Sequence, residues 1–264
     1  MTYATAPGDP DIVNEDFVAA SPSAAVVLDG VTPMDRSDTG CRHGVAWYAR
    51  RLGTELFALA TTTASQPRSL VDCLADAIAC TRDAHSGSCD LAHPDSPAAT
   101  VAVVRMVGDQ IDYLVLSDAA VVLDLGTHLC EVSDNRAGQV SRRLRAGGVR
   151  PTGPVVRAHR NRPEGYWVAA EQPEAAYEAL TGTAATAEAH RIVVASDGAT
   201  RLVDTFGLYD WPGALDVLQR DGPDAWLERT RAAERAEAAD PAGARRAKVH
   251  DDATVVLFGR TTAG

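Results

Sequence analysis

The sequence contains no long apolar run, and none of its segments approaches the roughly 20 apolar residues that a membrane-spanning helix needs. The first residues, "MTYATAPGDPDIVNEDF", have neither the basic nor the apolar segment of a secretion signal. We therefore expect a cytoplasmic protein without a membrane partner. Polar low-complexity tracts are absent too, and 45% of the 264 residues are hydrophobic, which predicts a globular fold.

Basic charge and paired cysteines are also scarce. The chain has 25 Lys and Arg residues against 36 Asp and Glu residues, so its formal net charge is -11 and we expect no nucleic acid partner. None of the five cysteines forms a C-x-x-C pair, and none of the seven histidines has H-x-x-x-H spacing. We therefore expect buried free thiols, with neither a disulfide framework nor a cysteine-based zinc site.

Motifs of several enzyme classes are missing. Neither G-x-G-x-x-G nor G-x-x-x-x-G-K-[ST] occurs, which argues against a nucleotide-binding fold. Because there is no G-x-S-x-G elbow, we expect Ser196 in "SDG" to be a strand residue and not a nucleophile. A two-metal nuclease would need a basic groove, which the net charge disfavours.

Apolar runs bounded by turn residues predict strands, and apolar residues at helical spacing predict helices. The predicted strands are 16–20, 24–29, 99–107, 111–117, 120–125, 128–133, 166–169, 191–196 and 253–259. The predicted helices are 40–60, 68–84, 136–146, 173–180, 211–220 and 223–237. The four strands within 99–133 indicate an antiparallel meander, and the whole pattern favours packed sheets covered by helices.

Carboxylates stand at the ends of the apolar runs. Asp29 in "AAVVLDGVT", Asp118 in "YLVLSDAA" and Asp197 in "RIVVASDGA" follow their strands. Asp251 and Asp252 in "HDDATVVLFG" precede theirs. If the last strand runs antiparallel to the others, these carboxylates meet at one edge of the sheets.

Several like charges so close together need a compensating cation, and carboxylate oxygens suit Mg²⁺ or Mn²⁺. Glu15 and Asp16 in "NEDF" add two acids just before another strand. Gly30 and Gly198 follow two of the aspartates directly and allow the backbone to approach an ion closely. The alternative is that each aspartate only caps the turn after its strand.

Six segments, taken in order, resemble the metal-dependent protein phosphatases of the protein phosphatase 2C (PPM) type. They are "NEDF" (14–17), "VVLDG" (26–30), "AATVAVV" (98–104), "YLVLSDAAV" (113–121), "VVASDGATRLVD" (193–204) and "DDATVVLF" (251–258). The resemblance implies one α+β domain over residues 1–264, a four-layer α/β/β/α sandwich of two antiparallel sheets flanked by helices. It also implies a centre of two Mn²⁺ or Mg²⁺ ions at one end of the sandwich.

The resemblance also assigns roles to particular residues. Asp29 would bridge both ions, and Gly30 would offer its carbonyl oxygen to one of them. Asp197 and Asp251 would hold the other ion, so these three aspartates are the expected catalytic residues.

The remaining acids have outer roles in this resemblance. Glu15 and Asp16 would act mostly through bound water. Asp118 would help to hold a third, weaker ion. The ions would activate the water that hydrolyses the phosphoester.

The chain departs from the family pattern at three positions. Asp11 stands where members usually carry an arginine that grips the substrate phosphate, and we expect Arg42 to replace that arginine. Val31 replaces a histidine that bacterial members often lack as well. Arg201 stands where an acid of the third ion site is expected, so that site is weakened or missing.

The expected function is hydrolysis of phosphoserine and phosphothreonine on phosphorylated protein substrates by a monomeric enzyme. Two alternatives stay open. One is a catalytically weak or inactive member that serves as a regulatory or binding module, which Asp11 and Arg201 motivate. The other is a phosphatase of a small phosphorylated metabolite.

Overall fold

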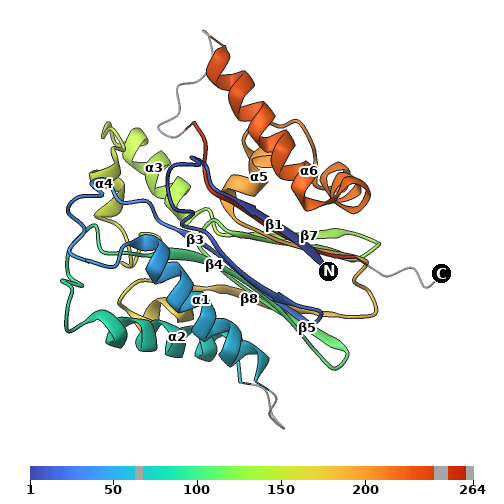
Figure 1. The fold of residues 1–264 in the computed structure, drawn as a ribbon, viewed down its shortest axis with the longest axis horizontal. Coiled ribbons are helices and arrows are strands. Elements are labelled where there is room, and N and C mark those ends of the chain that lie inside the picture. Colours follow the sequence, from blue (N-terminus) through green and yellow to red (C-terminus); the bar gives the residue numbers. More distant parts are fainter. Residues whose placement is uncertain (63–67, 241–248, 260–264) are drawn as a thin grey trace.

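Two antiparallel five-stranded sheets pack face to face in the computed structural model, which describes residues 1–62, 68–240 and 249–259 (Figure 1). The first sheet has the order β1-β10-β9-β6-β7. Its strands are β1 (Thr2–Ala6), β10 (Ala253–Gly259), β9 (Arg191–Ala195), β6 (Ala120–Asp124) and β7 (Leu129–Ser133). The second sheet has the order β2-β3-β4-β5-β8. Its strands are β2 (Phe17–Ser21), β3 (Ala24–Gly30), β4 (Ala99–Val107), β5 (Gln110–Leu116) and β8 (Leu180–Ala185).

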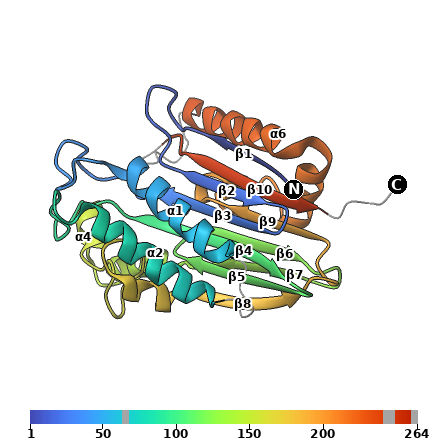
Figure 2. The same ribbon diagram turned by 60° about the horizontal axis from the view of Figure 1, so that its bottom comes forward.

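Helices cover the outer face of each sheet, as Figures 1 and 2 show. The second sheet is covered by α1 (Val45–Thr61) and α2 (Leu70–His85), and the first by α5 (Asp197–Asp204) and α6 (Trp211–Ala239). The shorter elements are α3 (Arg136–Ala146), α4 (Gly153–Arg157) and the 3-10 helix η1 (Pro173–Glu178). The predicted α/β/β/α sandwich of the α+β class is therefore confirmed.

The central strands are apolar on both faces because each face meets a different core. In β3, Ala25 and Val27 pack between the two sheets, whereas Val26 and Leu28 pack under α1 and α2. This alternation follows from the two-residue period of a strand. A continuous apolar run thus indicates a strand that is covered on both sides.

Helix ends follow local capping rules. The Ser69 hydroxyl accepts a hydrogen bond from the backbone N–H of Asp72 at 3.0 Å and so caps α2. Within α6, Gly222 has a φ of 88° just before Pro223. The kink there separates two helical segments, in agreement with the two helices predicted on either side of it.

The structure corrects three sequence predictions. Residues 99–133 are not one meander, because β4 and β5 lie in the second sheet and β6 and β7 in the first. The chain changes sheets at Ser117, whose φ of 70° allows the abrupt turn. The predicted strand 166–169 contributes only two isolated bridges, which pair Ala169 with Ala99 and Tyr166 with Arg160. Of the five unpaired cysteines only Cys73 is buried, while Cys80 is exposed.

Among the residues that the structure describes, no helix has both the length and the apolarity needed to cross a bilayer. Four elements were not predicted, namely β1, β8, α4 and α5. The strands β1 and β8 each form the edge of a sheet and are partly exposed, so their apolar pattern is weak.

Candidate functional site

Sheet register brings the predicted acids to one end of the sandwich. In the first sheet, β10 and β9 pair antiparallel with Val255 opposite Ala195. Asp197 follows β9 and Asp251 precedes β10, so the two carboxylates lie at the same end. The direction predicted for the last strand is confirmed.

The second sheet brings another pair of acids together. Phe17 of β2 stands opposite Leu28 of β3. Asp16 directly precedes Phe17 and Asp29 directly follows Leu28, so these two aspartates are neighbours across the pair of strands. The register of β2 and β3 therefore brings the acids of "NEDF" and "VVLDG" together in space.

A hydrogen bond joins the two sheets at this end. The Ser196 hydroxyl donates to Oδ2 of Asp16 at 2.9 Å and accepts from the backbone N–H of Thr254 at 2.9 Å. Ser196 follows β9 as the residue before α5, and it is buried. Its hydroxyl thus orients an acid. Ser196 lies outside β9, so the prediction that it is a strand residue is wrong, and the prediction that it is not a nucleophile stays a prediction.

We call Asp16, Asp29, Asp118, Asp197 and Asp251 the acidic centre. Asp16 is buried, Asp118 is exposed, and the other three are half-buried. The centre therefore runs from the interior to the solvent, which gives an ion a route to the inner carboxylates.

Desolvation and mutual repulsion shift the titration of this centre. Burial raises the pKa of Asp16 to about 7, against the effect of hydrogen bonds from Thr254 and Ser196. Burial, reinforced by the charges of Asp118 and Asp251, likewise raises the pKa of Asp197 to about 7. The pKa of Asp29 is raised well above its ordinary value by burial and then by the charge of Asp197. A bound cation would offset both the burial and the repulsion of these negative charges, so carboxylates in this environment favour metal binding.

Two oxygens of the centre lack protein partners. Within the described part of the chain, Oδ1 of Asp16 and Oδ1 of Asp197 are buried without a hydrogen bond. A buried unpaired carboxylate oxygen is costly. A divalent cation, bound directly or through its water ligands, would satisfy these oxygens, so the donor set fits a hard metal ion.

The glycines of the two D-G pairs are tightly surrounded. A Cβ at Gly30 would overlap the side chain of Val45, and a Cβ at Gly198 would overlap the carbonyl oxygen of Asp252. The lack of a side chain therefore lets these backbones lie close to their neighbours. The Asp252 carboxylate accepts hydrogen bonds from the backbone N–H groups of Gly8 and Glu15, each at 2.7 Å. It anchors the segment that leads into β2.

Arg36 engages the carboxylate of Glu15, which sequence reasoning did not foresee. Nη1 and Nη2 of Arg36 donate to the two Glu15 oxygens at 2.7 and 3.0 Å, and the Thr32 hydroxyl adds a bond of 3.0 Å. Glu15 is buried beneath this pair. The structure thus places Glu15 beside the acidic centre with its charge already compensated.

Arg201 compensates the charge of Asp251 as Arg36 compensates that of Glu15. Its guanidinium donates to Oδ2 of Asp251 at 2.8 Å and to Oε1 of Glu234 at 2.6 Å. Glu234 is fully buried in α6 and also accepts from Arg231 and lies 2.8 Å from Nδ1 of His250. Apart from the Arg231–Glu234 pair, the partners in this network are 16 to 50 residues apart, which is why it was missed from sequence. The network ties α5, α6 and the start of β10 together.

The exposed side of the acidic centre opens into a cleft of about 550 Å³ that Asp118, Asp134, Asp197 and Arg201 line. Asp134 is buried and paired with Arg136 at 2.7 Å. Its charge acts on Asp118. Asp134 is thus a further acid near the site, which we did not single out although it directly follows the predicted strand 128–133.

Arg42, predicted to hold the phosphate, is exposed and lines a second cleft of about 600 Å³. Arg36, Arg50, Asp11 and Glu15 line the same cleft, which we call the arginine pocket. Three guanidinium groups stand there against two carboxylates. Asp11, which stands where an arginine was expected from the resemblance, therefore lies among other arginines in this cleft.

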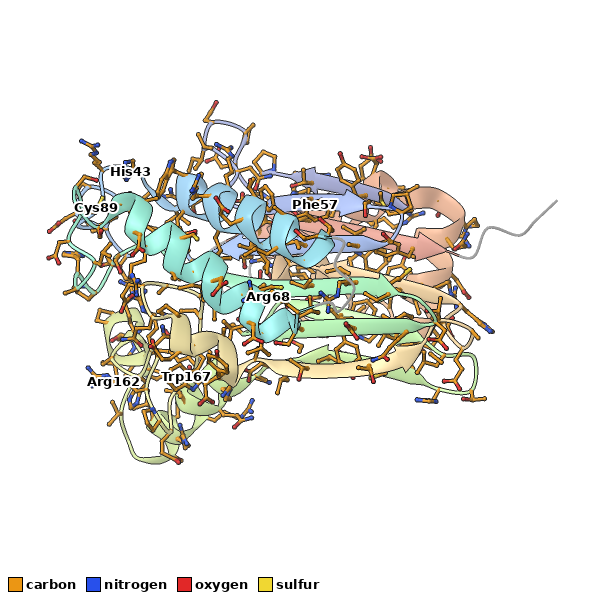
Figure 3. The ribbon with its side chains drawn as sticks, turned by 90° about the horizontal axis from the view of Figure 1, so that it is seen from below. His43, Phe57, Arg68, Cys89, Arg162 and Trp167 are labelled. Carbon is orange, nitrogen blue, oxygen red and sulfur yellow. The ribbon has the colours of Figure 1, made fainter. Side chains whose placement is uncertain are left out.

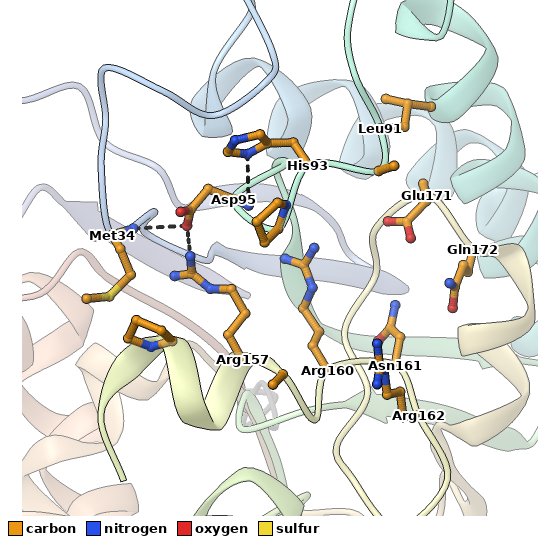
Figure 4. A pocket seen from close by; sticks show the side chains of 14 residues that line it. Met34, Leu91, His93, Asp95, Arg157, Arg160, Asn161, Arg162, Glu171 and Gln172 are labelled. Carbon is orange, nitrogen blue, oxygen red and sulfur yellow. Dashed lines mark hydrogen bonds and ion pairs between the residues drawn. The ribbon is translucent and has the colours of Figure 1, made fainter. Parts of the chain in front are cut away.

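A third cleft of about 400 Å³ lies under the segment 147–165 (Figure 4). Arg157 pairs there with Asp95, and Arg160 donates to the backbone carbonyl of Ser96 at 3.3 Å. Arg162 belongs to the same lining. The segment between α3 and Tyr166 is thus held against the loop that precedes β4.

The structure also gathers Cys41, His43, His85 and Cys89 into one group. One ligand atom from each residue lies within 4.8 Å of the other three. We did not expect this cluster, because we took the absence of a C-x-x-C pair as evidence against it. The available signal was a C-x-H pair and an H-x-x-x-C pair, 44 residues apart from Cys41 to His85.

Solved structures with the same fold are numerous. The chain matches the serine/threonine phosphatase PstP/Ppp of Mycobacterium tuberculosis with a TM-score of 0.62 at 16% identity, over 97% of this chain and 96% of that one. It matches Stp1 of Staphylococcus aureus with a TM-score of 0.63 at 12% identity, over 97% and 92%. A catalytic domain of PstP in complex with two manganese ions matches with a TM-score of 0.59 at 17% identity, over 97% and 95%.

Two comparisons of the sequence itself gave different results. No curated protein matches the chain in sequence. A family model described as protein phosphatase 2C matches residues 10–238, which include most of the acidic centre. The chain therefore belongs to the protein phosphatase 2C family.

Proposed function

We propose that this chain is a metal-dependent phosphatase that hydrolyses phosphoserine and phosphothreonine on proteins. The observation that carries the proposal is the acidic centre, in which buried and half-buried carboxylates from both sheets repel one another and leave two oxygens without partners. Membership of the protein phosphatase 2C family and the manganese bound by PstP support the choice of ion.

Four residues would be the ligands of two Mn²⁺ or Mg²⁺ ions. Asp29 would be shared between the ions, and Gly30 would contribute its carbonyl oxygen. Asp197 and Asp251 would hold the second ion. Divalent ions held in this way would supply Lewis acidity and lower the pKa of a bound water.

The outer acids complete this assignment. Asp16, oriented by Ser196, and Glu15, held by Arg36, would contact the ions through water. Asp118, at the exposed rim, would contribute to a third and weaker site.

Arginines of the chain would hold the substrate. In the arginine pocket, Arg42 and Arg50 face solvent beside Arg36 and would bind a phosphate group. Arg157, Arg160 and Arg162 line the neighbouring cleft. Positive charge along two adjacent clefts suits a phosphorylated peptide segment, which is longer than a small metabolite.

Hydrolysis of p-nitrophenyl phosphate by the purified protein tests the proposal. We expect activity with Mn²⁺ that EDTA abolishes, and loss of activity in Asp29→Ala and Asp197→Ala. A panel of phosphoserine and phosphothreonine peptides against sugar and nucleotide phosphates then separates the two substrate classes. Full metal-dependent activity in both variants would refute the assignment of the acids.

A non-catalytic binding module is the second candidate. Two acids of the site already carry arginine partners, since Arg201 binds Asp251 and Arg36 binds Glu15. An arginine can replace the charge of a metal ion without its chemistry. Calorimetric titration with Mn²⁺ distinguishes the candidates, because a module of this kind would give no heat at millimolar metal or would bind metal without turnover of any phosphopeptide.

A further inference from the structure

We propose that Cys41, His43, His85 and Cys89 form a second metal site, which binds a structural Zn²⁺ ion. We call these residues the Cys/His cluster. The site is separate from the acidic centre and does not depend on the proposed phosphatase activity. All four side chains belong to residues that the structure describes.

The distances between ligand atoms carry the proposal. Sγ of Cys41 lies 3.2 Å from Sγ of Cys89 and 3.6 Å from Nδ1 of His85. Nδ1 of His43 lies 3.8 Å from Sγ of Cys41 and 3.4 Å from Sγ of Cys89. A tetrahedron with Zn–S of about 2.3 Å and Zn–N of about 2.1 Å has edges of about 3.4 to 3.8 Å. The three sulfur–nitrogen distances lie in this range, and the sulfur–sulfur distance of 3.2 Å is slightly shorter.

The donor chemistry selects the ion. Two thiolates and two imidazoles are soft or borderline ligands, which favour Zn²⁺ over Mn²⁺ or Mg²⁺. Four protein ligands close a tetrahedral site and leave no position for a substrate, as in structural zinc sites. A Cys41–Cys89 disulfide is the competing use of the thiols, but their sulfur atoms are more than 1 Å beyond the bond length of about 2.05 Å.

The helix pair explains why the ligands meet. Cys41 and His43 stand just before α1, whereas His85 ends α2 and Cys89 follows in the next turn. Because α1 and α2 run antiparallel under the second sheet, the start of one lies beside the end of the other (Figure 2). Figure 3 shows His43 and Cys89 at this end of the helix pair.

Aromatic rings enclose the cluster. Trp47 stacks on His43 with ring centroids 4.3 Å apart and lies 5.3 Å from the ring of His85. The Tyr48 ring is 6.0 Å from His85, and His85 is 2% exposed. These rings fix the imidazoles on one side of the cluster and shield it from water. The indole of Trp47 also provides a fluorescent probe next to the ligands.

A bound ion would stabilise the loops that border the phosphatase site. The loop 31–44 begins after Gly30 and carries Arg36, and the loop 86–98 leads to β4 beside Asp29. They already touch where the backbone N–H of Asp90 donates to the carbonyl of Gly40 at 2.8 Å. Coordination of one zinc ion by Cys41 and Cys89 would link these two loops. It would therefore fix the segment that holds Arg36 on Glu15.

Metal analysis of protein purified without chelators tests the proposal. We expect about one zinc ion per chain by mass spectrometry, and its loss in the double variant Cys41→Ser/Cys89→Ser. Cys80→Ser is the matched control, because Cys80 is an exposed cysteine on α2 outside the cluster and its variant should keep the zinc. We also expect the double variant to unfold at a lower temperature than Cys80→Ser.

Cobalt gives a readout that does not require a folded variant. Co²⁺ added to zinc-depleted wild-type protein should produce the visible absorption of a tetrahedral thiolate site. It should also quench the part of the tryptophan fluorescence that comes from Trp47, one of four tryptophans. The proposal is refuted if wild-type protein holds no zinc and gives no thiolate–cobalt absorption. It is also refuted if the double variant keeps its zinc, or if peptide mapping of the unreduced protein finds Cys41 and Cys89 in a disulfide.

Discussion

The acidic centre and the Cys/His cluster differ in how their ligand atoms come together. The cluster draws on the ends of two adjacent helices, and its thiols and imidazoles can be neutral before metal binds. The acidic centre draws on both sheets, and its carboxylates repel one another. The four ligand atoms of the cluster all lie within 4.8 Å of one another.

This difference shows how a fold can hold like charges before a metal arrives. In the acidic centre, burial and mutual repulsion raise the pKa values of Asp29 and Asp197, and Arg201 pairs with Asp251. Next to the centre, Arg36 pairs with Glu15. The cluster needs no such compensation. Four predictions test this comparison. They ask whether the two regions act independently and whether only the acidic centre needs its negative charge compensated.

The largest effect is expected from Asp29→Ala. Removing the acid that we propose is shared by both ions should lower metal-dependent phosphatase activity by roughly a thousandfold or more, because the ions lose their common ligand. The zinc content of the same variant should not change. Initial rates with p-nitrophenyl phosphate and metal analysis measure the two effects, with the exposed Asp216→Asn as control. Joint loss of activity and zinc would contradict the independence of the two sites.

The next effect concerns the arginine that compensates Asp251. Burial opposes the charge of Glu234, yet hydrogen bonds from Arg231 and His250 lower its pKa below the ordinary value, so it is ionised. Glu234→Gln would leave buried Arg201 short of its anion and should lower the free energy of unfolding by about 3 kcal/mol. Urea unfolding measures this change. Glu228→Gln, at an exposed position of the same helix, should change it by less than about 0.5 kcal/mol. Equal effects would show that the network does not compensate the centre.

A smaller effect is expected from pH. The pKa values of Asp16 and Asp197 rise from 3.8 to about 7 on folding, so the folded state binds more protons than the unfolded state between these values. The contribution of these two carboxyl groups to the stability of the metal-free protein is therefore full below the lower value and is lost as pH rises through the higher one. Melting temperatures in EDTA across this window measure the slope. Mn²⁺ and Asp197→Asn should each flatten it, and a slope unchanged by both would contradict the repulsion.

The smallest effect is expected at the residue between the two regions. Arg42 stands between two cluster ligands and also lines the arginine pocket. Because its guanidinium is exposed, Arg42→Ala should raise KM for a phosphopeptide only about threefold, with kcat unchanged. Steady-state kinetics measure this change, and Arg51→Ala on α1 is the control. A fall in kcat without a change in KM would place Arg42 in a different role.

Local sequence patterns determined the elements that build the fold. Apolar runs predicted β4 and β10 with the observed bounds, and helix periodicity predicted α3 with its observed bounds. The polarity of strand-end acids also followed from sequence, because a carboxylate at the end of an apolar run is a local feature. Asp29, Asp197 and Asp251 could therefore be chosen before the fold was known, although their roles as ligands stay proposals.

Tertiary structure decided how distant segments meet. Only the fold reveals that the chain changes sheets at Ser117, that Arg201 and Arg36 hold acids of the site, and that two cysteines and two histidines meet at a helix corner. Secondary structure follows from neighbours within a few residues, which the sequence displays directly. Ion pairs and ligand clusters depend on packing between elements, and no spacing along the chain encodes it.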